Sequence, residues 1–340
     1  MIAVVKKSAT PEQLEHFIAW IEARGLRTDV SVGDTETIVG IIGDTSKVDP
    51  FILESMSIVS HVQRVTEPFK MASRAFHPSD STVDVGHGLL VGGGHFQVIA
   101  GPSAVEGDSI FELARHAREG GATMLRGGVY KSRTSPYAYQ GLGDEGLDLL
   151  VEAGHALDMP VVTEALEVEQ VWRLVDADVD VIQVGARNAQ NYALLKELGH
   201  TRVPVLLKRG IGGTIDELLM AAEYVMSEGN PSVLLCERGI RTFETRTVST
   251  FDVNAVAVLK SLTHLPVVVD ATNACGYARY VSSAACAATA AGADCLELEI
   301  HTNPDEALAG GAQALTPDQF ARTMRRIRLI REAVTCDVED

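Results

Sequence analysis

The feature that most constrains this 340-residue chain is an eightfold alternation that begins near residue 95. Apolar runs typical of buried strands alternate with amphipathic stretches of helical period. The apolar runs are FQVIAGPSA (96–104), ATMLRGG (122–128), MPVVTEA (159–165), VDVIQVGA (179–186), VPVLLKRG (203–210), SVLLCERG (232–239), LPVVVDAT (265–272) and CLELEIH (295–301). Buried strands that alternate with helices predict a parallel sheet covered by helices, and eight of them predict a closed barrel. We therefore predict an α/β fold, a (β/α)8 TIM barrel, over residues 95–340.

Residues 1–70 show a different order of elements. A short strand, IAVVKK (2–7), precedes a helix that begins at a Ser/Thr cap, and the last strand is expected within HVQRVTEP (61–68). The complete order, βαββαβ, predicts a ferredoxin-like α+β domain. Its role is open between a regulatory ligand-binding domain and a folding or dimerisation appendage. Residues 71–94 lose this periodicity, so we expect a linker there, with a short hairpin that closes the bottom of the barrel.

Charge and composition exclude several classes of partner. The chain carries 46 acidic residues against 29 Lys and Arg, a formal net charge of −17. Such a field repels nucleic acid and anionic membranes. No apolar run reaches the roughly 18–20 residues of a transmembrane helix, and the N-terminus lacks the order of a signal peptide, which indicates a cytoplasmic protein. The five cysteines form no CxxC pair and lie mostly in apolar runs, so reduced, buried thiols are expected.

Charged residues are concentrated where the predicted strands end, which is where barrels of this kind place their catalytic and binding groups. These residues are Arg126, Lys131, Arg133, Glu164, Arg187, Lys208, Arg209, Glu237, Arg238, Arg241, Asp270, Glu299 and His301. A single Lys or Arg is usually a solvated surface charge. Five or more at one mouth of an acidic protein instead indicate a site for phosphate or carboxylate groups.

Glu299 gives a second signal, because it closes the apolar strand LELEIH (296–301). A carboxylate in such a position must be hydrogen-bonded, paired with a cation or bound to a metal ion. His301 follows closely enough to orient Glu299 or to share a ligand with it. Two such residues alone indicate a metal site only weakly.

The runs at the strand ends, taken in order, resemble the 3-deoxy-D-arabino-heptulosonate 7-phosphate (DAHP) synthases, in particular the type I beta branch with an N-terminal ferredoxin-like domain. The resemblance spans essentially the whole chain. The runs that carry it are GPSAVE (101–106), LRGGVYKSRTSPYAYQGLG (125–143), TEAL (163–166), QVGARNAQNYALLKELG (183–199), PVLLKRGIGGTIDE (204–217), LCERGIRTFET (235–245), LPVVVDATN (265–273) and LEIHTNPDEALAGGAQALTP (298–317). This family condenses phosphoenolpyruvate with erythrose 4-phosphate and releases phosphate, the first step of the shikimate pathway to the aromatic amino acids.

The resemblance implies roles for individual residues. The phosphoenolpyruvate grip would consist of Arg126, Lys131, Arg187, Lys208 and Arg238. The aldehyde substrate and its distal phosphate would be held by Arg133, Thr134 and Ser135. Lys131, within reach of both substrates, is the expected general acid, and Glu164 is the candidate for positioning the attacking water.

The resemblance fails at the metal site. Members of the family bind a divalent ion such as manganese, zinc or cobalt through Cys, His, Glu and Asp. The matching positions here are Ser103, Asn273, Glu299 and Gly310. Ser and Asn are poor ligands for such ions, and the single remaining carboxylate gives little affinity. We therefore predict that the chain has no metal cofactor, unless Cys275 or His301 rebuilds the site.

Three functions are consistent with this pattern. The first is DAHP synthase-like aldol condensation without metal, in which Ser103, Asn273 and Lys131 orient and protonate an aldose phosphate, with erythrose 4-phosphate as the expected acceptor. The second is a non-catalytic regulatory paralogue that binds phosphorylated ligands and associates with a chorismate mutase-like partner. The third is a phosphoenolpyruvate-dependent synthase of secondary metabolism with another acceptor. We expect a homodimer or homotetramer, and the N-terminal domain suggests feedback control by an aromatic amino acid or a pathway intermediate.

Overall fold

A computed structural model describes residues 1–33, 36–45, 48–63 and 68–336. The chain divides into two compact units. The first holds Met1–Asp80 together with Ser261–His264, and the second begins at Ser81 and contains the rest. The boundary at Asp80 falls inside the segment 71–94 that the sequence suggests as a linker.

The first unit has the predicted βαββαβ order. Its elements are β1 (Ile2–Val5), α1 (Pro11–Glu22), β2 (Arg27–Val32), β3 (Thr37–Ile42), α2 (Pro50–Glu54) and β4 (Val59–Gln63). The strands form an antiparallel sheet in the order β2-β3-β1-β4, and Phe17, Ile21 and Leu53 of the helices pack in one core with strand residues such as Val39. The predicted ferredoxin-like α+β domain is confirmed. Within the strand expected at 61–68, residues 64–67 lie outside the described residues.

The second unit is the predicted barrel. Its strands are β7 (Gln97–Gly101), β8 (Met124–Arg126), β9 (Val161–Ala165), β10 (Val181–Val184), β11 (Val205–Lys208), β12 (Val233–Glu237), β13 (Val267–Asp270) and β14 (Cys295–Glu299). Every neighbouring pair is parallel, and β14 pairs with β7 to close the sheet. Each strand falls within the apolar run predicted for it. The (β/α)8 barrel is confirmed.

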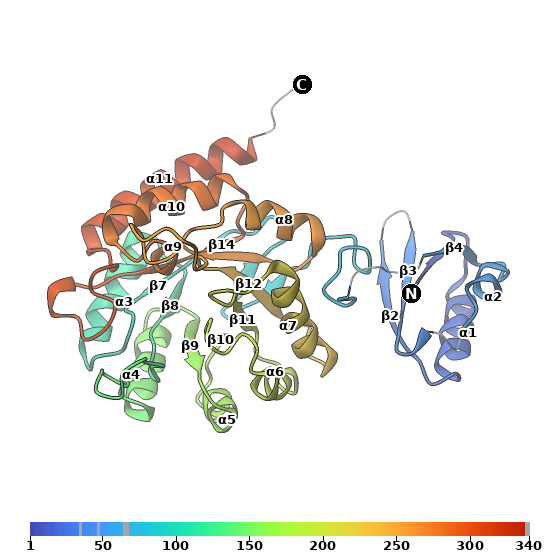
Figure 1. The fold of residues 1–340 in the computed structure, drawn as a ribbon, viewed down its shortest axis with the longest axis horizontal. Helices are drawn as coiled ribbons and strands as arrows, with labels where there is room; N and C mark the ends of the chain where they lie inside the picture. The colour runs from blue at the N-terminus through green and yellow to red at the C-terminus, as the bar shows by residue number, and fades with distance from the viewer. Residues whose placement is uncertain (34–35, 46–47, 64–67, 337–340) are drawn as a thin grey trace. The chain divides into compact units, whose positions relative to one another are not determined.

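Helices surround the barrel strands (Figure 1). They are α3 (Ser109–Gly120), α4 (Asp144–His155), α5 (Val168–Asp176), α6 (Tyr192–Gly199), α7 (Ile215–Ser227), α8 (Asn254–Leu262), α10 (Ala278–Ala290) and α11 (Pro317–Thr335). A further short helix that the sequence does not predict, α9 (Ala271–Cys275), follows β13 directly, because the Asp270 carboxylate caps it by accepting from the backbone N–H of Asn273. No helix in the described segments combines the length and the apolarity needed to cross a membrane.

The amino-terminal end of the barrel is closed by apolar side chains. The strands β5 (Val83–Asp84) and β6 (Leu90–Val91) form the antiparallel hairpin expected in this segment. Val83, Val85 and Val91 share one core cluster with inward residues of the barrel strands, such as Ile99 and Met124. Because this end is filled, the polar side chains of the strands collect at the opposite, carboxyl end.

Candidate active site

A cavity of about 280 Å³ lies at the carboxyl ends of the barrel strands. Its walls are formed by the residues Ser103, Arg126, Lys131, Ser132, Arg133, Thr134, Glu164, Gln183, Gly185, Ala186, Arg187, Lys208, Arg238, Asn273, Glu299, Gly310 and Gln313. Nearly all the predicted site residues are therefore brought to one cavity. Among the residues to which the resemblance assigns a role, the exception is Ser135, whose hydroxyl accepts from the backbone N–H of Tyr137 at 3.3 Å. The strand-end candidates that do not line the cavity are Arg209, Glu237, Arg241, Asp270 and His301.

Four cations of the lining, Lys131, Arg133, Arg187 and Arg238, form what we call the cationic set. Lys131 and Arg133 come from the loop between β8 and α4, while Arg187 and Arg238 follow β10 and β12. None of the four has an ion-pair partner in the described part of the chain. Arg133 and Arg238 donate instead to the carbonyls of Tyr139 at 3.1 Å and Gly239 at 3.1 Å, which hold their side chains in place. The cationic set can therefore meet anionic groups of a ligand.

The two other cations of the lining are already neutralised. Arg126 Nη1 lies 2.9 Å from carboxylate oxygens of both Glu297 and Glu299. Lys208 Nζ lies 2.5 Å from Asp270 and 3.0 Å from Glu297. Burial alone would lower the pKa of Lys208, but the two carboxylates outweigh it and raise that pKa. Burial would likewise lower the pKa of Arg126, but the negative charges of Glu297 and Glu299 outweigh it and raise that pKa. Both side chains stay protonated, are buried and are held by carboxylates of the protein.

Lys131 differs from the other lysine of the cavity in its protonation. Its Nζ donates to the Ser103 carbonyl at 2.7 Å and lies 3.4 Å from the Ser103 hydroxyl. Burial, followed by the repulsion of Arg126, lowers the pKa of Lys131 to about 8. Gly128 makes this position accessible, because a Cβ there would lie 2.7 Å from Lys131 Cδ. Lys131 is thus an amine that can lose and regain a proton near neutral pH.

Glu164, near the end of β9, is an acidic residue that lines the same cavity as the cationic set. Gln183 Nε2 donates to its Oε2 at 3.3 Å. No cation pairs with this carboxylate within the described residues. It is therefore available to orient a polar group, such as a water molecule, in the cavity.

The positions at which the resemblance implies metal ligands converge on one corner of the cavity. Ser103, Asn273, Glu299 and Gly310 lie there together with Gln313, and we call these five residues the amide set. Glu299 Oε1 accepts from Asn273 Nδ2 at 3.3 Å as well as from Arg126, and Glu299 Oε2 accepts from Gln313 Nε2 at 2.7 Å. A Cβ on Gly310, whose φ is +73°, would lie 2.7 Å from Glu299 Oε2. The corner is closely filled around one carboxylate.

These residues do not fit a divalent metal ion. Both oxygens of Glu299 already accept hydrogen bonds from nitrogen donors, and Asn273 turns its N–H group, which cannot ligate a cation, toward that carboxylate. The two residues that would have rebuilt the site lie elsewhere. His301 Nε2 faces Glu106 at 3.5 Å, and neither His301 nor Cys275 lines the cavity. The alternative of a rebuilt site finds no support in this geometry.

Sequence reasoning missed three polar residues of this site. Gln313 and Gln183 line the cavity, and Glu297 pairs with both buried cations. Glu297 carried a usable signal, because side chains two apart on a strand point to the same face and Glu299 was already a candidate site residue. Gln313 lies in a loop without periodicity and carried no such signal.

Comparison with known proteins identifies the family. Residues 77–333 match the DAHP synthetase I family, and residues 1–67 match the DAHP synthase ferredoxin-like domain. The chain belongs to the DAHP synthetase I family. Members of this family typically depend on a metal ion.

The relatives of this DAHP synthetase I chain fall into two groups. A phospho-2-dehydro-3-deoxyheptonate aldolase of Thermotoga maritima is 42% identical over 335 residues, 98% of each chain. A 2-dehydro-3-deoxyphosphooctonate aldolase of Syntrophobacter fumaroxidans is 32% identical over 278 residues, 74% of this chain and 95% of that protein. The crystal structure of the Thermotoga DAHP synthase superposes with a TM-score of 0.77 at 41% identity and covers 98% of this chain and 97% of its own. The similarity to the Thermotoga protein thus extends over both units of this chain.

Proposed function

We propose that this protein is a DAHP synthase that condenses phosphoenolpyruvate with erythrose 4-phosphate, releases inorganic phosphate and works without the divalent metal of its family. The observation that carries the proposal is the cationic set, whose four charges face the cavity without carboxylate partners. Phosphoenolpyruvate brings a carboxylate and a phosphate, and erythrose 4-phosphate brings a second phosphate. Cations that have no internal partner suit such a strongly anionic pair of ligands.

The residues divide between the two substrates in our proposal. Arg187, Arg238 and Lys131 hold phosphoenolpyruvate, and the buried, paired Arg126 and Lys208 add positive charge to the same cavity. Arg133 and Thr134 hold the aldose phosphate, because both line the cavity in the loop that also carries Lys131. Ser135 supports this loop through its bond to Tyr137 and does not contact substrate directly. Fixing both reactants in one cavity aligns the two carbons that must meet.

Lys131 and Glu164 supply the proton chemistry. The methylene carbon of phosphoenolpyruvate attacks the aldehyde carbon, which forms the new carbon–carbon bond and leaves negative charge on the former carbonyl oxygen. The Lys131 ammonium group protonates this oxygen. Water, oriented by Glu164, then adds to the phosphate-bearing carbon and gives up one proton, which returns to Lys131 by way of Glu164. The remaining hydroxyl proton passes to the leaving phosphate as the carbon–oxygen bond to phosphate breaks, which leaves a ketone and inorganic phosphate. Lys131, with a pKa of about 8, is matched to proton donation near neutral pH.

The amide set takes the place of the metal site in this proposal. Gln313 and Asn273 donate to Glu299 at 2.7 and 3.3 Å, and Arg126 pairs with it at 2.9 Å, so that no metal ion is needed to balance this carboxylate. The Ser103 hydroxyl lies beside Lys131 and helps to direct its ammonium group. Protonation by Lys131 then replaces polarisation by a metal ion at the aldehyde.

The test is phosphate release from phosphoenolpyruvate with a panel of aldose phosphates, combined with mass spectrometry of the product. We expect release to be fastest with erythrose 4-phosphate and the product to be a seven-carbon sugar acid phosphate. Faster release with arabinose 5-phosphate and an eight-carbon product would contradict the assigned acceptor. Tight phosphoenolpyruvate binding by calorimetry, with no release on any acceptor, would identify a non-catalytic paralogue instead.

A further inference from the structure

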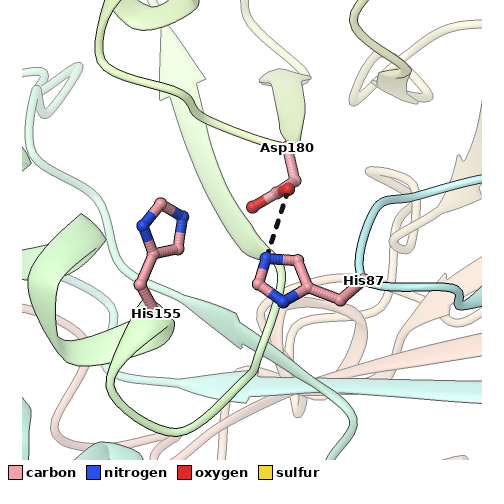
Figure 2. Close-up of side chains that lie close together, drawn as sticks. All are labelled: His87, His155 and Asp180. Atoms are coloured by element: carbon pink, nitrogen blue, oxygen red, sulfur yellow. Dashed lines mark ion pairs between the residues drawn. The ribbon is translucent and has the colours of Figure 1, made fainter.

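A second group of titratable side chains lies in the barrel unit at the amino-terminal ends of the strands, the end opposite the cavity. His87 stands in the turn between β5 and β6, His155 ends α4, and Asp180 directly precedes β10. Figure 2 shows the three side chains gathered around a common space from these three elements. Within the described residues, no other group of three or more His, Cys, Asp and Glu side chains places its ligand atoms so close together.

The spacing of this group suits one ion. One ligand atom from each residue lies within 4.8 Å of the others, and His87 Nε2 is 3.7 Å from Asp180 Oδ1. Zinc binds His nitrogen and Asp oxygen at about 2.0–2.2 Å, so two of its ligands are at most about 4 Å apart. His87 and Asp180 already meet this limit. His155 is exposed, and its ring centroid lies 5.6 Å from that of His87.

A neighbouring carboxylate fixes which nitrogen of His87 is free. His87 Nδ1 lies 2.6 Å from Asp158 Oδ1. A carboxylate that is ionised at neutral pH can only accept a hydrogen bond. Asp158 is thus the ionised acceptor and Nδ1 carries the proton. In neutral His87 the lone pair is then on Nε2, the atom that faces Asp180. A lone pair opposite a carboxylate repels it unless a cation lies between them.

Among the described residues, Asp180 has no Lys or Arg partner, and its ion-pair contact is with His87. Its Oδ2 accepts from the backbone N–H of Val161 at 2.7 Å, which leaves Oδ1 directed toward His87. Only 15% of the Asp180 side chain is exposed. A bound cation would compensate the burial of this carboxylate.

We propose that His87, His155 and Asp180 form a zinc site at the floor of the barrel, distinct from the active site. Two imidazoles and a carboxylate are a ligand set that zinc accepts, with water in the fourth position. Asp158, which accepts the other ring N–H of His87, orients that ligand as carboxylates do around histidine–zinc bonds. The ion joins the hairpin that closes the barrel floor to α4 and to the start of β10, and its role is to hold that hairpin in place.

The experiment measures zinc binding to the untagged full-length chain after chelator treatment and dialysis. We expect one Zn²⁺ per chain and a melting temperature that rises when Zn²⁺ is added. The His155→Gln variant should lose both effects. His200→Gln is the matched control, because it makes the same change at an exposed histidine that lies between Glu197 at 3.6 Å and Glu228 at 3.4 Å. This control should bind zinc like the parent chain.

Asp158→Asn gives an independent readout, because Asp158 touches His87 and not the ion. Loss of such an orienting partner should weaken zinc binding by roughly tenfold to a hundredfold without abolishing it. Folding of every variant is checked by its melting curve in chelator. Unchanged zinc binding in His155→Gln would overturn the proposal. So would a parent chain that binds no zinc and whose His87 titrates by NMR as an imidazolium ion held between Asp158 and Asp180.

Discussion

The cationic set and the amide set lie in the same cavity but treat charge in opposite ways. In the cationic set, Lys131, Arg133, Arg187 and Arg238 have no carboxylate partner in the described part of the chain. In the amide set, the single carboxylate, Glu299, receives donors on both oxygens from within the protein. The first set is incomplete without an anionic ligand. The second is complete without a metal ion, because Arg126, Asn273 and Gln313 already donate to Glu299.

This difference separates the residues of the cavity that bind ligand from those that stabilise the fold. A buried charge left without a partner costs several kcal/mol, so a protein leaves charges unpaired mainly where a ligand or solvent completes them. Substitutions in the cationic set should therefore change kinetics and leave stability nearly unaffected. Substitutions in the amide set should lower stability.

The largest expected effect is the removal of the general acid. Lys131→Met keeps a side chain of similar length but removes the proton donor and the contact with Ser103. We expect the rate of phosphate release at saturating substrate to fall by roughly 10²–10⁴, the usual contribution of general acid catalysis. Urea denaturation should give a stability close to that of the parent chain. A rate within threefold of the parent would show that another group donates the proton.

The pH dependence sharpens the same assignment. A general acid must be protonated to act, so kcat/KM should fall above about pH 8, the pKa of Lys131, by roughly tenfold per pH unit. The Lys131→Arg variant, whose guanidinium stays charged, should be slow but lack this alkaline limb. If kcat/KM of that variant still falls above about pH 8, the decrease is caused by a titratable group other than Lys131.

Removing one member of the cationic set tests ligand binding. Arg187→Ala should raise KM for phosphoenolpyruvate by roughly tenfold to a hundredfold, because a hydrogen bond to a charged group contributes about 1.5–3 kcal/mol. Arg241→Ala is the matched control, since Arg241 also follows β12 but does not line the cavity. Equal effects of the two changes would indicate a general field rather than a specific contact.

Substitutions in the amide set should lower the free energy of unfolding. Gln313→Leu removes the donor to Glu299 Oε2 and leaves a buried carboxylate oxygen without its hydrogen bond. We expect the free energy of unfolding to fall by about 1–3 kcal/mol in urea titrations. Gln190→Leu removes an exposed hydrogen bond to Glu217, 3.1 Å in length, and should change stability by less than about 0.5 kcal/mol. A neutral Gln313→Leu would mean that Glu299 does not need this donor.

Much of this site follows from sequence, for identifiable reasons. The eight strands are buried and nearly continuous in apolar residues, so their ends, and with them Arg126, Glu164, Arg187 and Lys208, can be located from periodicity alone. Which cations are neutralised cannot, because Arg126 and Lys208 meet Glu297 only once the sheet closes. That Ser135 lies outside the lining could not be predicted for a related reason, since the path of an irregular loop depends on local hydrogen bonds such as that to Tyr137.

Gln313 is the residue of the site that could least be predicted from the sequence. It lies between Gly310 and the start of α11, in a segment whose residues follow neither the strand nor the helix period. Its contact with Glu299 is made by the fold of that loop over the barrel mouth. The sequence shows that metal ligands are missing, whereas only the structure shows which group satisfies the remaining carboxylate.

The most direct measurement of the central claim is phosphate release and metal content on the same chelator-treated sample of the parent chain. We expect phosphate release from phosphoenolpyruvate and erythrose 4-phosphate to continue at an unchanged rate when no divalent metal is detectable. Added manganese or zinc should not increase that rate. Activity that disappears on chelation and returns with manganese, zinc or cobalt would contradict the account, because the amide set would then hold a catalytic metal ion after all.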